Sequence, residues 1–368
     1  MDRKAMGTAL HTREIVDNLL KIKRPEDEIY LVHRKKYDHP LYNHPEINEI
    51  VMPKVPTPRL ANVISEAIFL WKTRNDFDVI HYTQEAIYPL FWLSNAKIVV
   101  TIHSAAEGWR DYAMRIRWWL VYLTFKIFKR RLDAIISVSE TTRKSFQSYF
   151  NIPREKIHVI REGVIEAFRD RHDRLASERL ASEKYNIRLP YIFNGSRVDP
   201  QKNIPGLIKA FAKLKKDHNI PHQLVVGPKH WPKKEVKRVD GLIENLKLEE
   251  DVVFIKYVEE EDMPSLYFGS DLFVYPSLHE GFGLPLLEAM AAGVPIVTGN
   301  TFSMPEIAGD AALLADPYDP SDIASAMWKV LDDAKLKREL VRRGNARVKN
   351  FGWNKMTGEI FELYKQLV

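Results

Sequence analysis

One stretch, residues 277–293, places a loop with two glycines between an apolar segment and a short run of helix-forming residues. The apolar segment before it, residues 271–275, is typical of a buried parallel strand that ends at Pro276. Pro285 suits the first turn of a helix because its φ is fixed, and Gly293 suits the left-handed residue that follows a helix end. The sequence therefore predicts a strand, a glycine loop and a short helix in direct succession.

Two carboxylates flank the predicted start of this helix. Glu280 lies in the loop and Glu288 in the first turns, so both can face the helix N-terminus. Gly281 and Gly283 let the backbone approach a ligand, and the free N–H groups of the first turn favour a phosphate. A carboxylate accepts two hydrogen bonds and therefore binds a vicinal diol well. The stretch suits a nucleotide sugar; the alternative is a plain turn with two solvated glutamates.

The complete pattern, including the seven residues between the two glutamates, resembles the signature of the retaining glycosyltransferases of family 4. The resemblance implies the GT-B fold, an α/β architecture in which two Rossmann-like domains with doubly wound parallel sheets face a central cleft. It also implies that Glu280 contacts the donor sugar and that Glu288 binds the ribose hydroxyls. The residues that follow the first glutamate would offer backbone amides to the sugar and phosphates, and the implied donor site includes Gly281, Phe282, Gly283 and Leu284.

Predicted strands and helices alternate along the chain, which favours a parallel, doubly wound sheet. Ligands of such sheets bind at the carboxyl ends of the strands. No Gly-x-Gly-x-x-Gly follows a strand, which argues against a dehydrogenase. In the first half a helix is expected over residues 60–71, and strands are expected over residues 28–33, 50–52, 78–82, 97–103 and 133–139.

His103 stands at the carboxyl end of one predicted strand. An imidazole there can donate a hydrogen bond to a substrate oxygen, or it can cap the next segment. Family members carry a histidine at the end of this strand, near donor sugar and acceptor, so the resemblance implies a catalytic role. The aspartate that usually follows is Ser104 here.

The first half departs from the family pattern at both ends. Gly7 matches the family's loop near the donor phosphates, but the strand that normally precedes it is absent, so either the start is late or the sheet is one strand short. Glu162 and Ile165 replace the Asn and Asp of a family turn, and no ligand contact is assigned to them. Ser139 and Glu140 match a family pair, and the serine is expected to cap the following helix.

A second set of candidate residues follows the first predicted strand of the second half. Gly195 permits close approach of the backbone, and Arg197 and Lys202 can reach a diphosphate, although a basic surface loop is the alternative. In the family an Arg and a Lys at this spacing hold the donor phosphates, where other glycosyltransferases use a metal. The resemblance also places the loop with Tyr257 and Val258 near the base, mainly through backbone atoms.

Residues 109–131 combine seven basic residues and seven aromatic residues with a single acid. Two aromatic stripes appear at helical spacing, and only one can pack on the sheet. The second stripe suits anionic lipid, or a helix that is buried on two sides. The residues assigned to membrane contact are Trp109, Arg115, Arg117, Trp118, Lys126, Lys129 and Arg130.

The chain has 368 residues, enough for two domains, and its lack of cysteine excludes disulfides and thiolate chemistry. The net charge of +6 suits anionic lipid or an anionic ligand, and no nucleic-acid motif accompanies it.

No signal peptide or membrane-spanning run is visible, so we expect a cytoplasmic protein that docks on the cytoplasmic membrane face. The expected parts are residues 1–172, a linker at 173–189, residues 190–352 and a final helix at 353–368 that crosses back.

These observations predict a retaining, metal-independent glycosyltransferase that moves a hexose from a nucleoside diphosphate sugar to a hydroxyl of a glycan or lipid-linked acceptor. Residues 305–312 look most like mannosyltransferases of surface polysaccharide assembly, so GDP-mannose is the expected donor. Asp76 and Asp78 form a lone Asp-x-Asp at the wrong end of a strand for a metal, and no cofactor is expected. The alternatives are a nucleotide-sugar 2-epimerase of the same architecture and a non-catalytic nucleotide-sugar-binding subunit.

Overall fold

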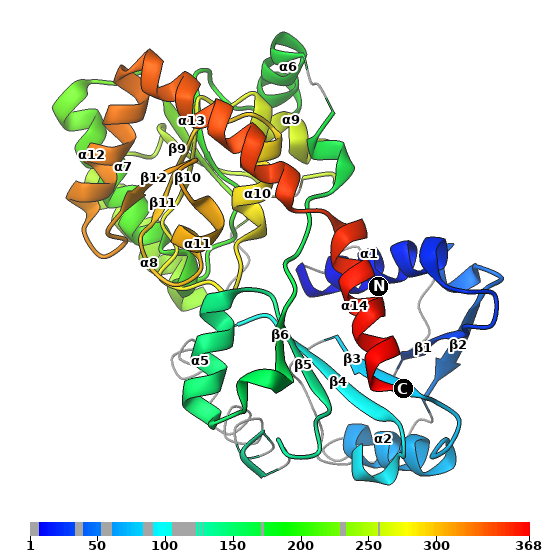
Figure 1. The fold of residues 1–368 in the computed structure, drawn as a ribbon. Coiled ribbons are helices and arrows are strands. Elements are labelled where there is room, and N and C mark those ends of the chain that lie inside the picture. The colour runs from blue at the N-terminus through cyan, green and yellow to red at the C-terminus, as the bar shows by residue number, and fades with distance from the viewer. Residues whose placement is uncertain are drawn as a thin grey trace. The chain divides into compact units, whose positions relative to one another are not determined.

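The computed structural model describes residues 7–33, 40–52, 61–83, 91–104, 123, 125–127, 129–170, 173–228, 233–256 and 258–368. The chain forms two compact units, one of residues 1–162 with 352–368 and one of residues 163–351 (Figure 1). Strands and helices alternate in both, and every strand pair among the described residues is parallel. The predicted α/β class with parallel sheets in two domains is confirmed.

The second unit contains a six-stranded sheet in the order β12-β11-β10-β7-β8-β9. Counted along the chain within this unit, the spatial order is 3-2-1-4-5-6, as in doubly wound dinucleotide-binding sheets. The order reverses between β7 and β10, and ligands of such sheets bind outside the strand ends at this point. The strands are β7 (Tyr191–Asn194), β8 (Gln223–Val226), β9 (Val252–Phe254), β10 (Leu272–Tyr275), β11 (Ile296–Gly299) and β12 (Leu313–Ala315).

Helices cover both faces of this sheet because the strands are apolar on both sides. On one face Ile192, Leu224 and Val274 join a core formed with α7 (Ile204–His218), α8 (Lys233–Leu246) and α12 (Pro320–Asp332). On the other face Phe193 and Phe273 pack against Tyr267 of α9, with ring centroids 5.0 and 4.9 Å from that of the tyrosine. The unit also contains α9 (Met263–Phe268), α10 (Leu284–Ala291), α11 (Met304–Ala308) and α13 (Ala334–Arg347), besides a helix near its start that is described below.

The first unit contains a four-stranded sheet in the order β3-β4-β5-β6 and a separate pair, β1-β2. The carboxyl ends of β3, β4 and β6 lie at one edge of the larger sheet, because its strands are parallel. The strands are β1 (Ile29–His33), β2 (Ile47–Val51), β3 (Val79–Tyr82), β4 (Lys97–Ile102), β5 (Ala134–Ser137) and β6 (Ile157–Val159).

Helices pack on both faces of the four-stranded sheet. Val100 and Ile102 of β4 contact the core side of α5 (Glu140–Phe150), whose first turn is capped by the Ser139 hydroxyl, as predicted. Thr101 points to the opposite face, where His81 links its hydroxyl to Tyr364 of α14 (Trp353–Leu367) through contacts of 2.7 and 2.5 Å. In Figure 1, α14 lies beside α1 (Gly7–Ile22) within this unit, which also contains α2 (Ala61–Lys72).

The segment predicted as a linker, residues 173–189, lies within the second unit and contains the helix α6 (Arg174–Tyr185). Polar contacts hold it there. Arg174 donates to Asp271 (2.8 Å), and the Tyr185 hydroxyl donates to Asp262 (2.6 Å). The division between the units falls after Glu162, earlier than the predicted boundary. A helix held by ion pairs has little apolar periodicity, so its sequence resembles a linker.

Candidate functional site

The residues predicted to bind a donor gather at the point where the strand order of the second unit reverses. The loop after β7 carries Arg197 and Lys202, and the loop after β10 carries Glu280. These strands are neighbours in the sheet but lie about eighty residues apart in the chain, with Leu272 beside Ile192. The parallel pairing therefore brings both loops to one sheet edge.

Lys202, Glu280 and Tyr275 form a closed hydrogen-bonded group. Lys202 Nζ donates to Glu280 Oε1 (2.6 Å) and to the Tyr275 hydroxyl (2.7 Å), which itself lies 2.8 Å from the same carboxylate oxygen. Gln201 donates to the second oxygen of Glu280 (3.2 Å). Burial alone would lower the pKa of Lys202, but the Glu280 carboxylate and the Tyr275 oxygen outweigh it and raise that pKa. The lysine is therefore a fixed positive charge at neutral pH.

The second glutamate, Glu288, lies one turn into α10 and accepts a hydrogen bond from the Tyr267 hydroxyl (2.7 Å). Burial raises the pKa of Glu288, and the hydrogen bond partly offsets that effect. Tyr267 is buried, and its ring also packs against Phe193 and Phe273 of the sheet. One oxygen of Glu288 is thus fixed by the protein.

The loop between the two glutamates is held by its backbone. Gly283 precedes α10 with φ of 111°, a conformation that suits glycine. The Ser303 hydroxyl lies 2.9 Å from the carbonyl of Glu280 and 2.7 Å from that of Phe282, so a residue from another loop fixes the turn. The Phe282 ring is buried, and Gly281 is buried as well. The Phe282 side chain is therefore not available to a ligand, and a donor contact through the backbone of this loop stays a prediction.

The loop after β7 brings a second basic group to the same edge. A Cβ added at Gly227 would lie 2.4 Å from the carbonyl oxygen of Gly195, so the strand ends approach each other closely. Arg197 is partly exposed, and its Nε lies 3.8 Å from Asp199 Oδ2. Burial lowers the pKa of this guanidinium, which still remains charged at neutral pH. Lys202 pairs with Glu280, and Arg197 adds a second positive charge to the same loop.

Among the residues that the structure describes, the other predicted donor residues of the second unit make no side-chain hydrogen bond to the lysine–glutamate–tyrosine group. Leu284 is the first residue of α10, and Val258 is partly buried after β9. Tyr257 lies outside the described residues. Gly7 begins α1 and belongs to the first unit, as does His103.

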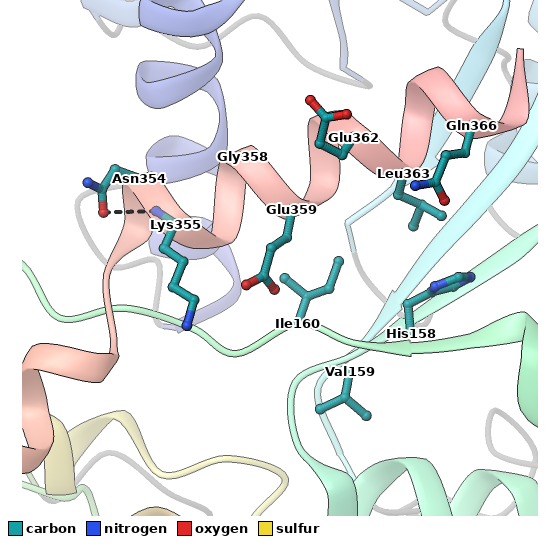
Figure 2. Close-up of a pocket in the computed structure, with 10 residues that line it drawn as sticks. All are labelled: His158, Val159, Ile160, Asn354, Lys355, Gly358, Glu359, Glu362, Leu363 and Gln366. Atoms are coloured by element: carbon teal, nitrogen blue, oxygen red, sulfur yellow. Dashed lines mark hydrogen bonds between the residues drawn. The ribbon is translucent and has the colours of Figure 1, made fainter.

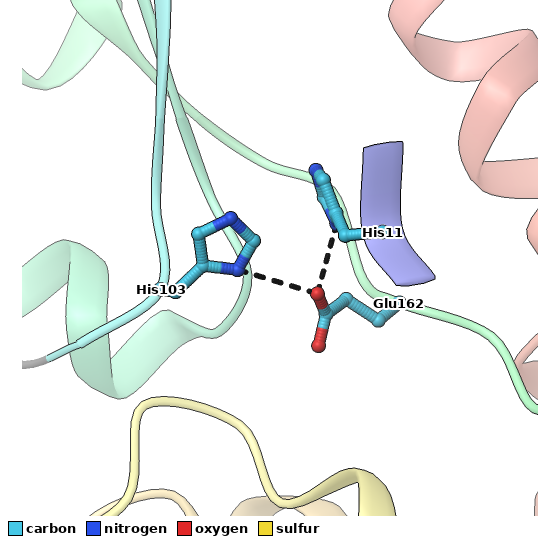
Figure 3. Close-up of side chains that lie close together, drawn as sticks. All are labelled: His11, His103 and Glu162. Atoms are coloured by element: carbon cyan, nitrogen blue, oxygen red, sulfur yellow. Dashed lines mark hydrogen bonds and ion pairs between the residues drawn. The ribbon is translucent and has the colours of Figure 1, made fainter. Parts of the chain in front are cut away.

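His103 is part of a cluster in the first unit that the sequence did not predict (Figure 3). Glu162 Oε1 lies 2.9 Å from His11 Nδ1 and 3.4 Å from His103 Nδ1, and the two rings meet edge to face at 4.4 Å. The other nitrogen of His103, Nε2, lies 2.9 Å from the carbonyl oxygen of Thr83. Both ring nitrogens of His103 thus face protein oxygens, which differs from a ring free to donate to substrate.

Glu162 and His11 are almost fully buried, with 3% and 0% of their surface exposed. Burial alone would raise the pKa of Glu162, but its contacts with His103 and His11 lower that pKa to about 2. Burial lowers the pKa of His11, and the charge of His103 acts in the same direction. The only signal in the sequence is a glutamate in place of the family's asparagine after β6, and its partner His11 lies 151 residues away.

A groove of about 490 Å³ lies between β6 and α14 within the first unit (Figure 2). Figure 2 shows two carboxylates among its side chains, those of Glu359 and Glu362. None of the predicted site residues lines it. The lining residues are His158, Val159, Ile160, Asn354, Lys355, Gly358, Glu359, Glu362, Leu363 and Gln366.

Four of the predicted membrane residues, Trp109, Arg115, Arg117 and Trp118, lie outside the described residues. Of the other three, Lys126 and Arg130 are exposed, whereas Lys129 donates to the carbonyls of Phe150 and Asn151 at the end of α5. Lys129 therefore has a partner inside the protein. In the part of the chain that the structure describes, no helix has the length and apolar character needed to cross a membrane.

Two family models match the chain. One, described as Glycosyltransferase Family 4, matches residues 7–168, and the other, described as Glycosyl transferases group 1, matches residues 178–347. The second range contains the loops after β7 and β10. The first contains all three residues of the histidine–glutamate cluster.

The alignments with curated relatives cover part of this chain and part of each relative. The chain is 34% identical to O-antigen chain mannosyltransferase B of Escherichia coli over 236 residues, which are 63% of this chain and 60% of that protein. It is 26% identical to the MMP alpha-(1->4)-mannosyltransferase of Mycolicibacterium hassiacum over 318 residues, 80% of this chain and 72% of that one. The alignment thus spans less than two thirds of the E. coli relative.

Among solved structures, Anabaena Alr3699/HepE in complex with UDP and glucose superposes with a TM-score of 0.81. The superposition covers 99% of this chain and 97% of that one at 17% identity. At this identity the likeness shows a common fold.

Proposed function

The chain belongs to the family 4 glycosyltransferases, which have the GT-B fold, and from this premise we propose that it transfers a hexose from a nucleoside diphosphate sugar to a hydroxyl acceptor. The proposed acceptor is a glycan or a lipid-linked sugar of surface polysaccharide assembly. Mannose is the proposed hexose and GDP-mannose the donor, since two relatives carry mannosyltransferase names and residues 305–312 resemble that group.

The observation that carries this proposal is the group of Lys202, Glu280 and Tyr275 beside the start of α10. It places a carboxylate and a partly buried ammonium group within 2.6 Å of each other where the strand order reverses. An ammonium group and the positive end of a helix dipole suit a diphosphate, and a carboxylate suits sugar hydroxyls. A molecule with both features is a nucleotide sugar.

In the proposed reaction Arg197 and Lys202 stabilise the negative charge that develops on the leaving diphosphate. The positive end of the α10 helix dipole acts in the same way. The bond between the sugar's anomeric carbon and the diphosphate oxygen breaks, and its electron pair leaves with the diphosphate. The acceptor oxygen bonds to that carbon on the same face, which retains its configuration, and the hydroxyl proton passes to the leaving diphosphate oxygen. The ion pair of Glu280 with Lys202 favours hydroxyl binding by Glu280 over a role as covalent nucleophile. Glu288 is proposed to bind the ribose hydroxyls.

The test is a transfer assay with GDP-mannose, GDP-glucose and UDP-glucose, each with a mannose-terminated glycan as acceptor. We expect transfer from GDP-mannose with retained anomeric configuration, detected by NMR. Release of a 2-epimer of the donor without acceptor would instead identify an epimerase. Donor binding without turnover by any acceptor would identify a binding subunit.

We also propose that this transfer needs no divalent cation at the diphosphate. Arg197 and Lys202 are the proposed partners of the diphosphate, and their charges would neutralise it without a metal ion. We expect the initial rate in excess EDTA to stay within about twofold of the rate without EDTA, since the arginine and lysine charges persist at neutral pH. A rate that is lost in EDTA and restored by magnesium or manganese would contradict this proposal.

A membrane location is proposed from the sequence of residues 109–131. Each basic residue near anionic lipid contributes about 1 kcal/mol, so the segment would bind vesicles reversibly and more weakly as salt rises. Co-sedimentation with anionic vesicles at low and high salt measures this. Protein that stays in the supernatant at low salt would contradict it, and Lys126→Glu with Arg130→Glu should weaken the binding.

A further inference from the structure

The cluster of His11, His103 and Glu162 joins three elements of the first unit at one carboxylate oxygen. His11 comes from α1, His103 follows β4 and Glu162 follows β6. Both Nδ1 atoms approach Glu162 Oε1, at 2.9 and 3.4 Å, and one ligand atom from each residue lies within 4.8 Å of the other two. Two imidazoles and a carboxylate in one buried place are the ligand types of transition-metal sites.

The hydrogen bonding of His103 indicates that positive charge belongs between these groups. Its Nε2 lies 2.9 Å from the Thr83 carbonyl, which can only accept a hydrogen bond, so Nε2 carries a proton. A neutral ring has one N–H, and its Nδ1 then presents a lone pair to Glu162 Oε1 at 3.4 Å. A lone pair on His103 Nδ1 would then face a lone pair on Glu162 Oε1. This contact is repulsive unless a second proton or a cation lies between the two atoms.

We propose that His11 Nδ1, His103 Nδ1 and a carboxylate oxygen of Glu162 bind a divalent transition-metal ion of the zinc type. The ion takes the place of the protons between the three groups. Zinc bonds of about 2.0–2.1 Å separate neighbouring tetrahedral ligands by about 3.3 Å, close to the 2.9 and 3.4 Å found here. The fourth position is left to water or to another oxygen.

The surroundings of His103 fit a metal ligand. Metal-binding histidines usually donate their other ring N–H to a carbonyl or carboxylate, which fixes the tautomer that leaves a lone pair for the metal. The Thr83 carbonyl supplies this acceptor. Imidazole nitrogen favours zinc-type ions over magnesium or calcium, which prefer oxygen ligands. The bound ion would connect α1 to the ends of β4 and β6 and thereby stabilise the first unit.

Metal binding is measured on the full chain without an affinity tag, because a histidine tag would bind zinc itself. After chelation and dialysis, zinc and cobalt(II) are added without donor or acceptor, so the result does not depend on the proposed transfer reaction. We expect one zinc per chain by metal analysis, a higher melting temperature with zinc, and the visible bands of low-coordinate cobalt with imidazole ligands.

Two variants locate the ion. Glu162→Gln and His11→Gln each remove one ligand, and we expect zinc affinity to fall by at least about 100-fold, since even outer-shell losses cost 10- to 100-fold. His222→Gln is the matched control, because His222 also pairs with a carboxylate, Asp271 at 3.2 Å, but lies in the second unit. It should bind zinc like the wild type.

Wild-type protein that binds neither zinc nor cobalt at micromolar concentrations would overturn the proposal, and the extra positive charge would then be a proton. Equal zinc uptake by the wild type and both cluster variants would overturn it as well, since the ion would lie elsewhere. If the variants do not fold, the wild-type cobalt spectrum decides, because cobalt coordinated only by water lacks imidazole bands.

Discussion

Glu280→Ala is expected to lower kcat by about 10- to 150-fold while leaving the affinity for the free nucleoside diphosphate nearly unchanged. Loss of a charged hydrogen-bond partner costs about 1.5–3 kcal/mol, which corresponds to that range of rates. Glu280 is proposed to bind the hexose, which the free nucleotide lacks. Lys202 keeps its contact to the Tyr275 hydroxyl (2.7 Å), so its charge remains in place for the diphosphate.

Glu288→Ala is the paired variant, and the opposite pattern is expected of it. The dissociation constant of the free nucleoside diphosphate should rise by about 10- to 150-fold, because a ribose ligand is lost. Isothermal calorimetry on both variants separates the two roles. Tyr267→Phe is the control, since it removes only the hydroxyl that donates to Glu288 (2.7 Å) and should have a smaller effect in the same direction. If Glu280→Ala weakens nucleotide binding as much as Glu288→Ala does, the assignment is wrong.

The parts of the donor site that the sequence predicted are those fixed by local chemistry. Pro285 in the first turn of α10, the left-handed Gly293 after that helix and the apolar run of β10 all follow from residue type and order. Parallel strands then bring the loops after β7 and β10 to one edge. No long-range information beyond the strand alternation is needed for this result.

The supporting residues could not be predicted because their sequence signal is that of ordinary core residues. Tyr267 and Tyr275 have buried rings that stack in the core of the sheet, and only the structure shows that their hydroxyls fix the two glutamates. Glu162 was assigned no contact, since its partner His11 lies far away in the chain. The helix α6 was missed for a different reason, because polar contacts rather than an apolar face hold it.

Lys202→Met is expected to lower kcat by about 10²- to 10³-fold, the usual effect of removing one group that stabilises charge in a transition state. The substitution also leaves Glu280 without its cation. Breaking a buried ion pair costs about 3–5 kcal/mol, and we expect roughly the lower end here because 18% of the lysine side chain is exposed. Both activity and the free energy of unfolding in urea should therefore fall.

A double variant separates these two effects. Lys202→Met combined with Glu280→Gln removes both charges, so much of the lost stability should return, because neither charge is left buried and unpaired. Activity should stay low, since the charge beside the diphosphate is still missing. Lys213→Met is the matched control, as this lysine pairs with Asp217 on the exposed side of α7 and should change neither quantity by much. Recovery of both kcat and stability in the double variant would contradict a role of Lys202 in catalysis. Lys202 would then serve only to hold Glu280 in position.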